Sequence, residues 1–199
     1  MAKNNSTLYK SLMSVWIIYS QAEIKLFLFS SSSRDLYNYL FIEAKILMKI
    51  WLITHSEELK KPSGTGRLVK EALQNECEII IWSRVSPNKD ILKLSPSNTL
   101  LIYLCNDEQD RFQANITESI DNIIILDGTW QQARKIYNQS PYLQKFRHYE
   151  IQNIKSAYKK RRNQKDIGLC TAEVAIQLLT EYQHPAAKEL SEKFIEFNQ

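Results

Sequence analysis

The junction at residues 122–130 constrains the fold of this chain more than any other stretch. Residues 122–126, Asn-Ile-Ile-Ile-Leu, are mostly apolar and β-branched and too few for a helix, which predicts a short buried β-strand. Residues 130–138 follow a helical period and precede Ser-Pro, which ends a helix. Asp127 therefore lies at the end of a strand, Gly128 permits a tight turn, and Thr129 can cap the helix. In open α/β sheets this kind of junction binds ligands.

Strands and helices are predicted to alternate along the rest of the chain. Further strands are predicted at 50–54, 78–82, 99–105 and 146–151, and further helices at 66–75, 171–182 and after Pro185. This alternation predicts an α/β fold with a mostly parallel sheet flanked by helices. The run at 99–105 is continuously apolar and is predicted to be central. The inward faces of the two periodic helices are predicted as Trp130, Ala133 and Tyr137, and as Ala172, Ala175, Ile176, Leu179 and Tyr182.

Length, charge and cysteine content narrow the class of protein. A chain of 199 residues can form one domain with a sizeable core, and its net charge of +4 does not by itself indicate a nucleic-acid partner. Cys77, Cys105 and Cys170 are widely spaced, odd in number and form no Cys-x-x-Cys motif. We therefore expect reduced thiols and a cytoplasmic location rather than a disulfide framework.

Residues 1–47 are predicted to form a segment separate from a domain at 48–199. An apolar run at 12–19 after Lys3 and Lys10 imitates a signal peptide, but it is short, contains Ser14 and lacks a small-x-small cleavage site, so secretion is not expected. The chain has no window of about 18 consecutive apolar residues, so no membrane association is expected. The segment is either a divergent extension or a misread start upstream of Met48.

Four short motifs occur along the chain. They are, in order, Gly64-Thr65-Gly66-Arg67-Leu68, Asp127-Gly128-Thr129-Trp130, Ser156 with Tyr158 and Arg161, and Cys170-Thr171-Ala172-Glu173-Val174-Ala175. Together and in this order they resemble the DTW-domain family of tRNA-uridine aminocarboxypropyltransferases. The resemblance covers about residues 49–179, and Gly64 replaces an Asn of the family pattern. Family members commonly carry an N-terminal cysteine cluster typical of zinc sites. Here no cysteine precedes Cys77, and His55, His148 and His184 lack a metal-ligand spacing, so no metal is expected.

The resemblance implies a fold, a reaction and partners. The fold would be SPOUT-like, with the possibility of a C-terminal trefoil knot. The reaction would move the 3-amino-3-carboxypropyl group of S-adenosylmethionine to N3 of a uridine in tRNA and release methylthioadenosine. No obligate protein partner is evident. Two alternatives stay open: a SPOUT-like S-adenosylmethionine-dependent RNA methyltransferase, and an RNA-binding module without catalysis.

The predicted catalytic residue is Asp127, which would either accept the N3 proton or bind the amino group of the donor. By resemblance, the donor would contact residues at three strand ends and two helix starts: Leu101, Leu104, Leu126, Thr129, Trp130, Gly168, Leu169 and Thr171. Trp130 could instead belong to the core, because an aromatic residue on the inner face of a helix usually does. Glu173 is predicted to serve the start of its helix.

The predicted RNA contacts centre on a basic run. Six cations occur within eleven residues: Lys155, Lys159, Lys160, Arg161, Arg162 and Lys165. Such a run is usually a solvated face, but the interleaved Tyr158 favours phosphate contact combined with stacking on an unpaired base. The predicted RNA-binding residues are Thr65, Arg67, Tyr158, Lys159, Lys160 and Arg161.

Overall fold

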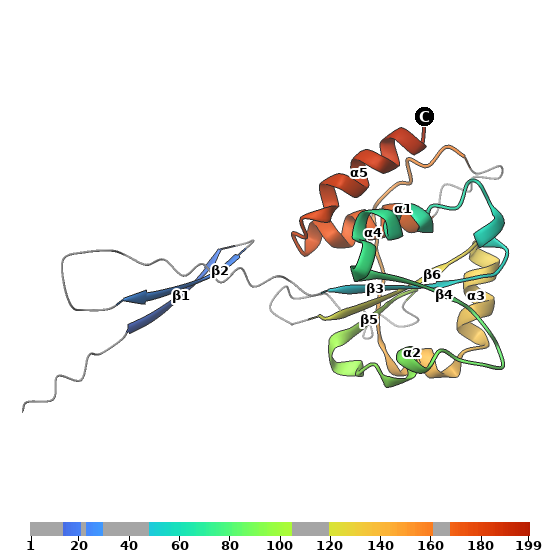
Figure 1. Ribbon diagram of the computed structural model, residues 1–199. Helices are drawn as coiled ribbons and strands as arrows, with labels where there is room; N and C mark the ends of the chain where they lie inside the picture. Colours follow the sequence, from blue (N-terminus) through green and yellow to red (C-terminus); the bar gives the residue numbers. More distant parts are fainter. Residues whose placement is uncertain (1–13, 21–22, 30–47, 105–119, 161–167) are drawn as a thin grey trace, which may run out of the picture. The chain divides into compact units, whose positions relative to one another are not determined.

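The computed structural model describes residues 14–20, 23–29, 48–104, 120–160 and 168–199 (Figure 1). Contacts divide the chain into two units, Met1–Lys45 and Ile46–Gln199. In the first unit β1 (Ser14–Ser20) pairs antiparallel with β2 (Glu23–Phe29). Most of the apolar run that imitates a signal peptide therefore lies in a β-strand.

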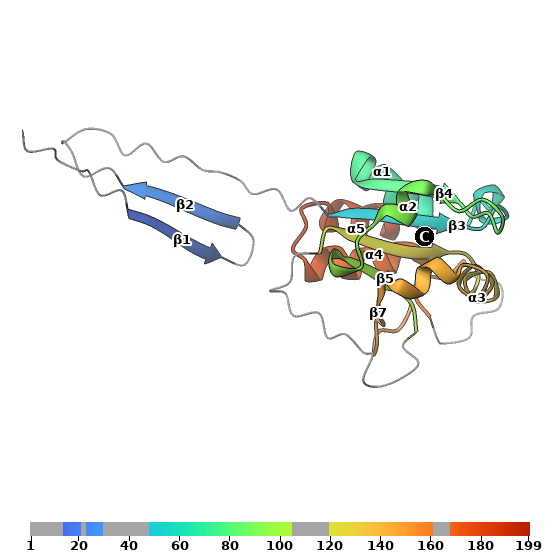
Figure 2. The same ribbon diagram turned by 90° about the horizontal axis from the view of Figure 1, so that it is seen from below.

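The second unit is built on a five-stranded sheet whose strands are all parallel (Figures 1 and 2). The strands are β3 (Lys49–Thr54), β4 (Cys77–Ile81), β5 (Thr99–Ile102), β6 (Asn122–Asp127) and β7 (Arg147–Tyr149). Their order across the sheet is β4-β3-β6-β5-β7. The α/β class and the parallel sheet are confirmed. The central strand is β6 rather than β5, which lies between β6 and β7.

Helices cover both faces of this sheet, as the alternation predicts. They are α1 (Gly66–Leu73), α2 (Lys89–Lys93), α3 (Trp130–Asn138), α4 (Thr171–Glu181) and α5 (Ala186–Phe197). Short 3-10 turns connect them at Glu58–Lys60, Gln74–Glu76, Pro96–Asn98 and Pro141–Lys145. In Figure 1, α1, α4 and α5 lie on one side of the sheet and α2 and α3 on the other. No helix in the described ranges is long and apolar enough to cross a membrane.

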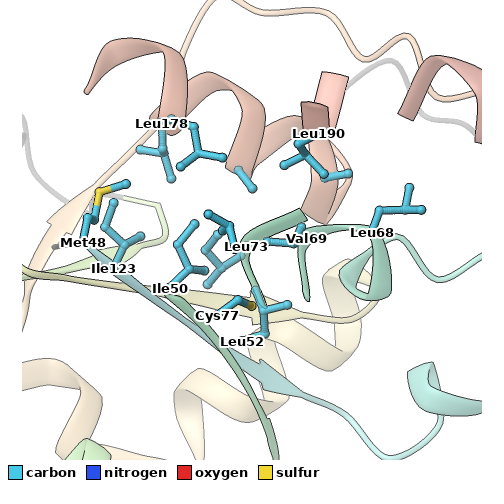
Figure 3. Packing of buried hydrophobic residues seen from close by; sticks show 14 of the residues in the cluster. Met48, Ile50, Leu52, Leu68, Val69, Leu73, Cys77, Ile123, Leu178 and Leu190 are labelled. Carbon is cyan, nitrogen blue, oxygen red and sulfur yellow. The ribbon is translucent and has the colours of Figure 1, made fainter. Parts of the chain in front are cut away.

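Successive residues of the inner strands alternate between two separate cores. In β3, Ile50 and Leu52 face the core under α1, α4 and α5, which is drawn in Figure 3, whereas Trp51 and Ile53 face the core beside α3. Both faces are therefore apolar, which explains why these strands are continuous apolar runs in the sequence. Packing into both cores fixes the C-terminal end of β6, where Asp127 lies.

The helix faces differ in part from those predicted. On α3 the buried residues are Ala133 and Ile136, whereas Tyr137 is half-buried and Trp130 is 48% exposed. On α4 the buried residues are Ala172, Ala175, Leu178 and Leu179, whereas Ile176 and Tyr182 are half-buried. The buried face of each helix is therefore turned slightly from the predicted one.

The boundaries agree within two residues for most elements. The helix predicted at 66–75 ends at Leu73, because Gln74 adopts a φ of 48° and a 3-10 turn follows. The SPOUT-like class, the trefoil knot and the boundary at residue 48 stay predictions. The strand predicted at 99–105 ends earlier, at Ile102. Cys105 and the segment 161–167 lie outside the described residues.

Truncation of a central core residue tests this architecture. Ile123 of β6 is fully buried, so we expect Ile123→Ala to lower the free energy of unfolding by about 2–5 kcal/mol through lost burial and a residual cavity. Denaturant unfolding followed by circular dichroism measures the change. The matched control is Ile195→Ala on α5, where the side chain is 60% exposed. A loss for Ile123→Ala as small as that of the control would contradict the proposed core.

Candidate functional site

The site begins where β3 and β6 end side by side. Thr54 and Asp127 are the last residues of these strands and pair with each other in register. After Thr54 the chain leads through α1 to β4 on one side of the sheet, and after Asp127 it leads through α3 to β7 on the other. This divergence is the switch point at which α/β sheets bind ligands.

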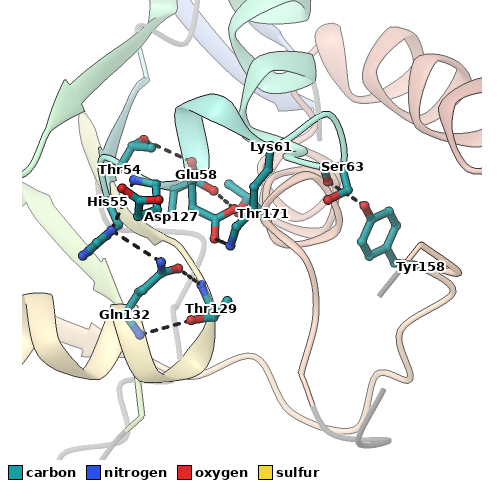
Figure 4. Close-up of polar contacts among 11 residues, drawn as sticks. Thr54, His55, Glu58, Lys61, Ser63, Asp127, Thr129, Gln132, Tyr158 and Thr171 are labelled. Carbon is teal, nitrogen blue, oxygen red and sulfur yellow. Dashed lines mark hydrogen bonds and ion pairs between the residues drawn. The ribbon is translucent and has the colours of Figure 1, made fainter. Parts of the chain in front are cut away.

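The carboxylate of Asp127 is buried and held by two hydroxyl groups (Figure 4). Thr54 Oγ1 donates a hydrogen bond to Oδ2 at 3.1 Å, and Thr171 Oγ1 donates one to Oδ1 at 2.6 Å. The start of α1 packs directly against the same group, since a Cβ added at Gly66 would lie 2.7 Å from Oδ2. Asp127 therefore joins β6 to β3, α1 and α4.

Burial raises the pKa of Asp127 above its ordinary value, because the ionised form loses hydration. The hydrogen bonds from Thr171 and Thr54 act in the opposite direction but do not cancel this effect. Glu58 raises the pKa further and Lys61 lowers it, and these two side chains form an ion pair with a 2.5 Å N–O distance. Asp127 consequently accepts a proton more readily than an exposed aspartate does.

Thr129 caps α3, as predicted. Its Oγ1 accepts a hydrogen bond from Gln132 N, and its own N donates to Gln132 Oε1 at 2.7 Å, which forms a capping box. Gln132 Nε2 lies 3.4 Å from His55 Nδ1, and the His55 ring stacks on Trp82 with a centroid distance of 5.9 Å. The cap thus fixes the loop between β6 and α3 beside the end of β3.

A cavity of about 660 Å³ adjoins this junction. Its walls come from the ends of β5 and β6, the start of α3, the segment after β7 and the start of α4. Six of the eight predicted donor-binding residues line it: Leu104, Leu126, Trp130, Gly168, Leu169 and Thr171. The sequence analysis missed the wall formed by residues 149–155.

The other two predicted donor-binding residues do not line the cavity. Leu101 is fully buried in the core beside α3, and its neighbour Ile102 lines the cavity instead. Thr129 is exposed, and its side chain caps α3. The error at Leu101 has a simple reason. Adjacent strand residues point to opposite faces, and both faces of β5 are apolar.

Trp130 belongs to the cavity wall rather than to the core. Its indole ring lies against Gly168, where an added Cβ would overlap the ring. Gly168 also has a φ of +120°, a conformation that L side chains rarely adopt. A glycine at this position therefore allows the chain entering α4 to approach the indole closely.

The first turn of α4 holds the segment that follows β7. Glu173 accepts hydrogen bonds from Cys170 N at 2.7 Å, from Ser156 Oγ at 2.8 Å and from Ala157 N at 2.6 Å. The first of these bonds completes a capping box, and the other two attach the segment after β7 to α4. Glu173 therefore serves the start of its helix, as predicted, and also positions this segment.

Two of the residues predicted to contact RNA are buried, which contradicts that prediction. Tyr158 is 3% exposed: its hydroxyl group donates to Ser63 O and its ring packs near Phe194 and Phe197, so it cannot stack on a base. Thr65 is 4% exposed, and its Oγ1 accepts from Ala172 N at 3.2 Å. Thr65 thus ties α1 to α4, and its side chain makes no capping hydrogen bond to α1.

Three other predicted RNA contacts, Arg67, Lys159 and Lys160, are exposed and are named here the basic surface. Arg67 Cζ lies 5.0 Å and Lys160 Nζ 4.7 Å from the centroid of the Phe197 ring. Residues far apart in the sequence thus bring two cations to one aromatic ring at the end of α5. Arg161, the sixth predicted contact, lies outside the described residues.

The three histidines occupy separate environments. His148 Nε2 lies 2.9 Å from the Tyr137 hydroxyl group, and His184 Nε2 lies 3.2 Å from a Glu76 carboxylate oxygen. Within the residues that the structure describes, no three His, Cys, Asp or Glu side chains gather as a metal-binding group.

Comparisons with known proteins identify the family. The DTW domain matches residues 39–199 of the chain. The tRNA-uridine aminocarboxypropyltransferase 2 of Drosophila melanogaster is 26% identical over 137 residues, which are 66% of this chain and 55% of that protein. The chain thus spans about half the length of this curated relative. No solved structure matches at a significant level. Because the matched region includes the whole second unit, with Asp127 and the adjoining cavity, the chain belongs to the DTW-domain family.

Proposed function

We propose that this protein is a tRNA-uridine aminocarboxypropyltransferase that uses S-adenosylmethionine as donor and modifies N3 of a uridine. The main support is the position of Thr171, which lines the cavity and also donates a hydrogen bond to the buried carboxylate of Asp127. One residue thereby connects a ligand-sized cavity to a proton-accepting group. The family membership and the name of the fly relative point to the same reaction class.

The cavity is suited to the proposed donor in size and chemistry. Its volume lies within the range of about 300–1,000 Å³ that is usual for small-molecule sites. Leu104, Leu126 and Leu169 supply apolar contact area, and the exposed indole of Trp130 supplies an aromatic face. When bound, the donor supplies a carbon activated by the adjacent sulfonium. The residues of the chain then have to hold that carbon in line with N3.

Asp127 is the proposed acceptor of the N3 proton. Burial raises its pKa, which makes the carboxylate a better base than an exposed aspartate. The hydroxyl group of Thr171 lies between this carboxylate and the cavity and can relay the proton. It would accept the proton of N3–H while its own proton moves to Asp127 Oδ1. The hydroxyl group of Thr171 then lies between N3, which loses the proton, and the carboxylate, which gains one.

The basic surface is the proposed contact for tRNA phosphates. Arg67, Lys159 and Lys160 are exposed cations, and two of them, Arg67 and Lys160, lie beside the ring of Phe197.

A cytoplasmic location is also part of the proposed function. The described cysteines Cys77 and Cys170 are buried free thiols, which suit a reducing compartment.

Mass spectrometry of tRNA nucleosides after incubation with the donor tests the reaction. We expect the wild-type protein to add the mass of an aminocarboxypropyl group, and Asp127→Asn to reduce the rate about a hundredfold or more, because proton acceptance is lost. Thr171→Ser, which keeps the hydroxyl group, is the matched control and should retain most activity. Addition of a methyl group would identify a methyltransferase, and full activity of Asp127→Asn would exclude an essential proton acceptor at this position.

The raised pKa of Asp127 predicts a pH-dependent contribution to stability. The folded protein binds a proton at this carboxyl group more tightly than the unfolded chain does. The resulting stabilisation is complete below the ordinary aspartate pKa of about 3.9 and is lost as the pH rises through the raised value. We therefore expect the difference in unfolding free energy between wild type and Asp127→Asn to fall over this window. A difference that rises with pH in denaturant titrations would contradict the raised pKa.

Removal of charge from the basic surface should weaken tRNA binding through its salt dependence. For Lys159→Ala/Lys160→Ala we expect the slope of log K against log salt to become shallower by about 0.7 to 0.9 for each lost phosphate contact. The matched control is Lys89→Ala/Lys93→Ala on α2, which covers the other face of the sheet. Equal slopes for wild type and the first variant would show that these lysines form only a solvated face.

A further inference from the structure

The cavity has an uneven charge distribution. Among the described residues that line it, the charged side chains are Glu150 and Lys155, and both belong to the segment that follows β7. The remaining walls are apolar, aromatic or uncharged. They include Ile102, Leu104, Ile125, Leu126, Ala133 and Val174. One wall therefore carries a negative and a positive group, and it faces walls that carry neither.

The backbone on both sides of this charged wall is anchored. Before it, Tyr149 pairs with Ile102 in the sheet, and Tyr103 N donates to Tyr149 O at 3.2 Å. After it, Ser156 Oγ donates to Glu173 of α4 at 2.8 Å. Between these anchors the chain turns at Asn153, whose φ of 61° lies in the left-handed region that Asn tolerates better than most residues. Glu150 and Lys155 are thereby kept on one side of the cavity.

We propose that Glu150 and Lys155 bind the α-amino-acid end of the donor, an inference that rests on the proposed function. That end carries an ammonium and a carboxylate on one carbon, so it needs one partner of each charge. The Glu150 carboxylate pairs with the ammonium group and the Lys155 ammonium pairs with the carboxylate. Charged hydrogen bonds of this kind are about twice as strong as neutral ones. The uncharged walls take the adenosine end.

This assignment separates two roles that the sequence left open for Asp127. Asp127 is not among the residues that line the cavity, and each of its oxygens already accepts a hydrogen bond from a threonine. Glu150 is on the cavity wall itself. Recognition of the donor amino group therefore belongs to Glu150, and Asp127 keeps the role of proton acceptor through Thr171.

Calorimetric titration with two ligands tests the inference without measuring turnover. The ligands are S-adenosylmethionine and methylthioadenosine, which lacks the amino-acid end. We expect Lys155→Met and Glu150→Gln to weaken binding of the first about tenfold, as the loss of one charged hydrogen bond predicts, and to leave the second unchanged. Retained binding of methylthioadenosine also shows that each variant is folded. The matched control is Lys93→Met on α2, an exposed lysine outside the cavity lining, which should change neither affinity.

The outcomes separate this inference from the proposed function. Wild-type affinity of both variants for S-adenosylmethionine, or equal losses for the two ligands, would overturn the zwitterion site. Selective loss of S-adenosylmethionine binding in Asp127→Asn, with Glu150→Gln unchanged, would assign the ammonium group to Asp127 and also overturn it. If the wild-type protein bound neither ligand, the donor cavity of the proposed function would itself be wrong.

Discussion

The architecture around the site depends on one buried carboxylate. An ionisable group taken out of water is costly unless hydrogen bonds compensate it, so Asp127 requires donors from its surroundings. Thr54 and Thr171 supply them, and they come from an adjacent strand and from a helix that begins 44 residues later. The close approach of Gly66 brings a third element to the same group. Satisfying one charge thus fixes how β3, β6, α1 and α4 meet, and it sets the position of Thr171 on the cavity wall.

The features of the site that could be predicted are those set by residues close together in the sequence. The β-branched run before Asp127 and the 3.6-residue period after it correctly place a strand end and a helix start, because both are determined by residues close in sequence. The same patterns do not tell which strand residue faces the cavity. Leu101 and Ile102 are equally apolar, and the choice between them depends on the pairing of β5 with β6 and β7. Tyr158 lies in a polar, basic stretch, and its burial is set by distant residues of α5.

The basic run illustrates how the fold divides one sequence feature between two parts of the surface. Lys155 lines the cavity, whereas Lys159 and Lys160 belong to the basic surface and do not line it, although all three lysines are exposed. Tyr158 separates them, because its buried ring and its hydrogen bond to Ser63 O attach the middle of the run to the protein. A count of charges along the sequence cannot reveal this division, since it arises from an anchor that only tertiary packing provides.

The same anchors connect the two sites mechanically. Asn198 accepts a hydrogen bond from Lys159 N and donates one to Ala157 O, both at 2.8 Å, so the end of α5 holds the segment that Glu173 holds from the other side. Lys159 lies four positions after Lys155, a span of at most about 14 Å between their Cα atoms even when fully extended. Under the proposed function, the short anchored backbone between Lys155 and Lys159 would therefore fix the position of a tRNA bound at Lys159 relative to the donor bound at Lys155. A preset distance of this kind supplies the alignment on which transfer from an already activated carbon depends.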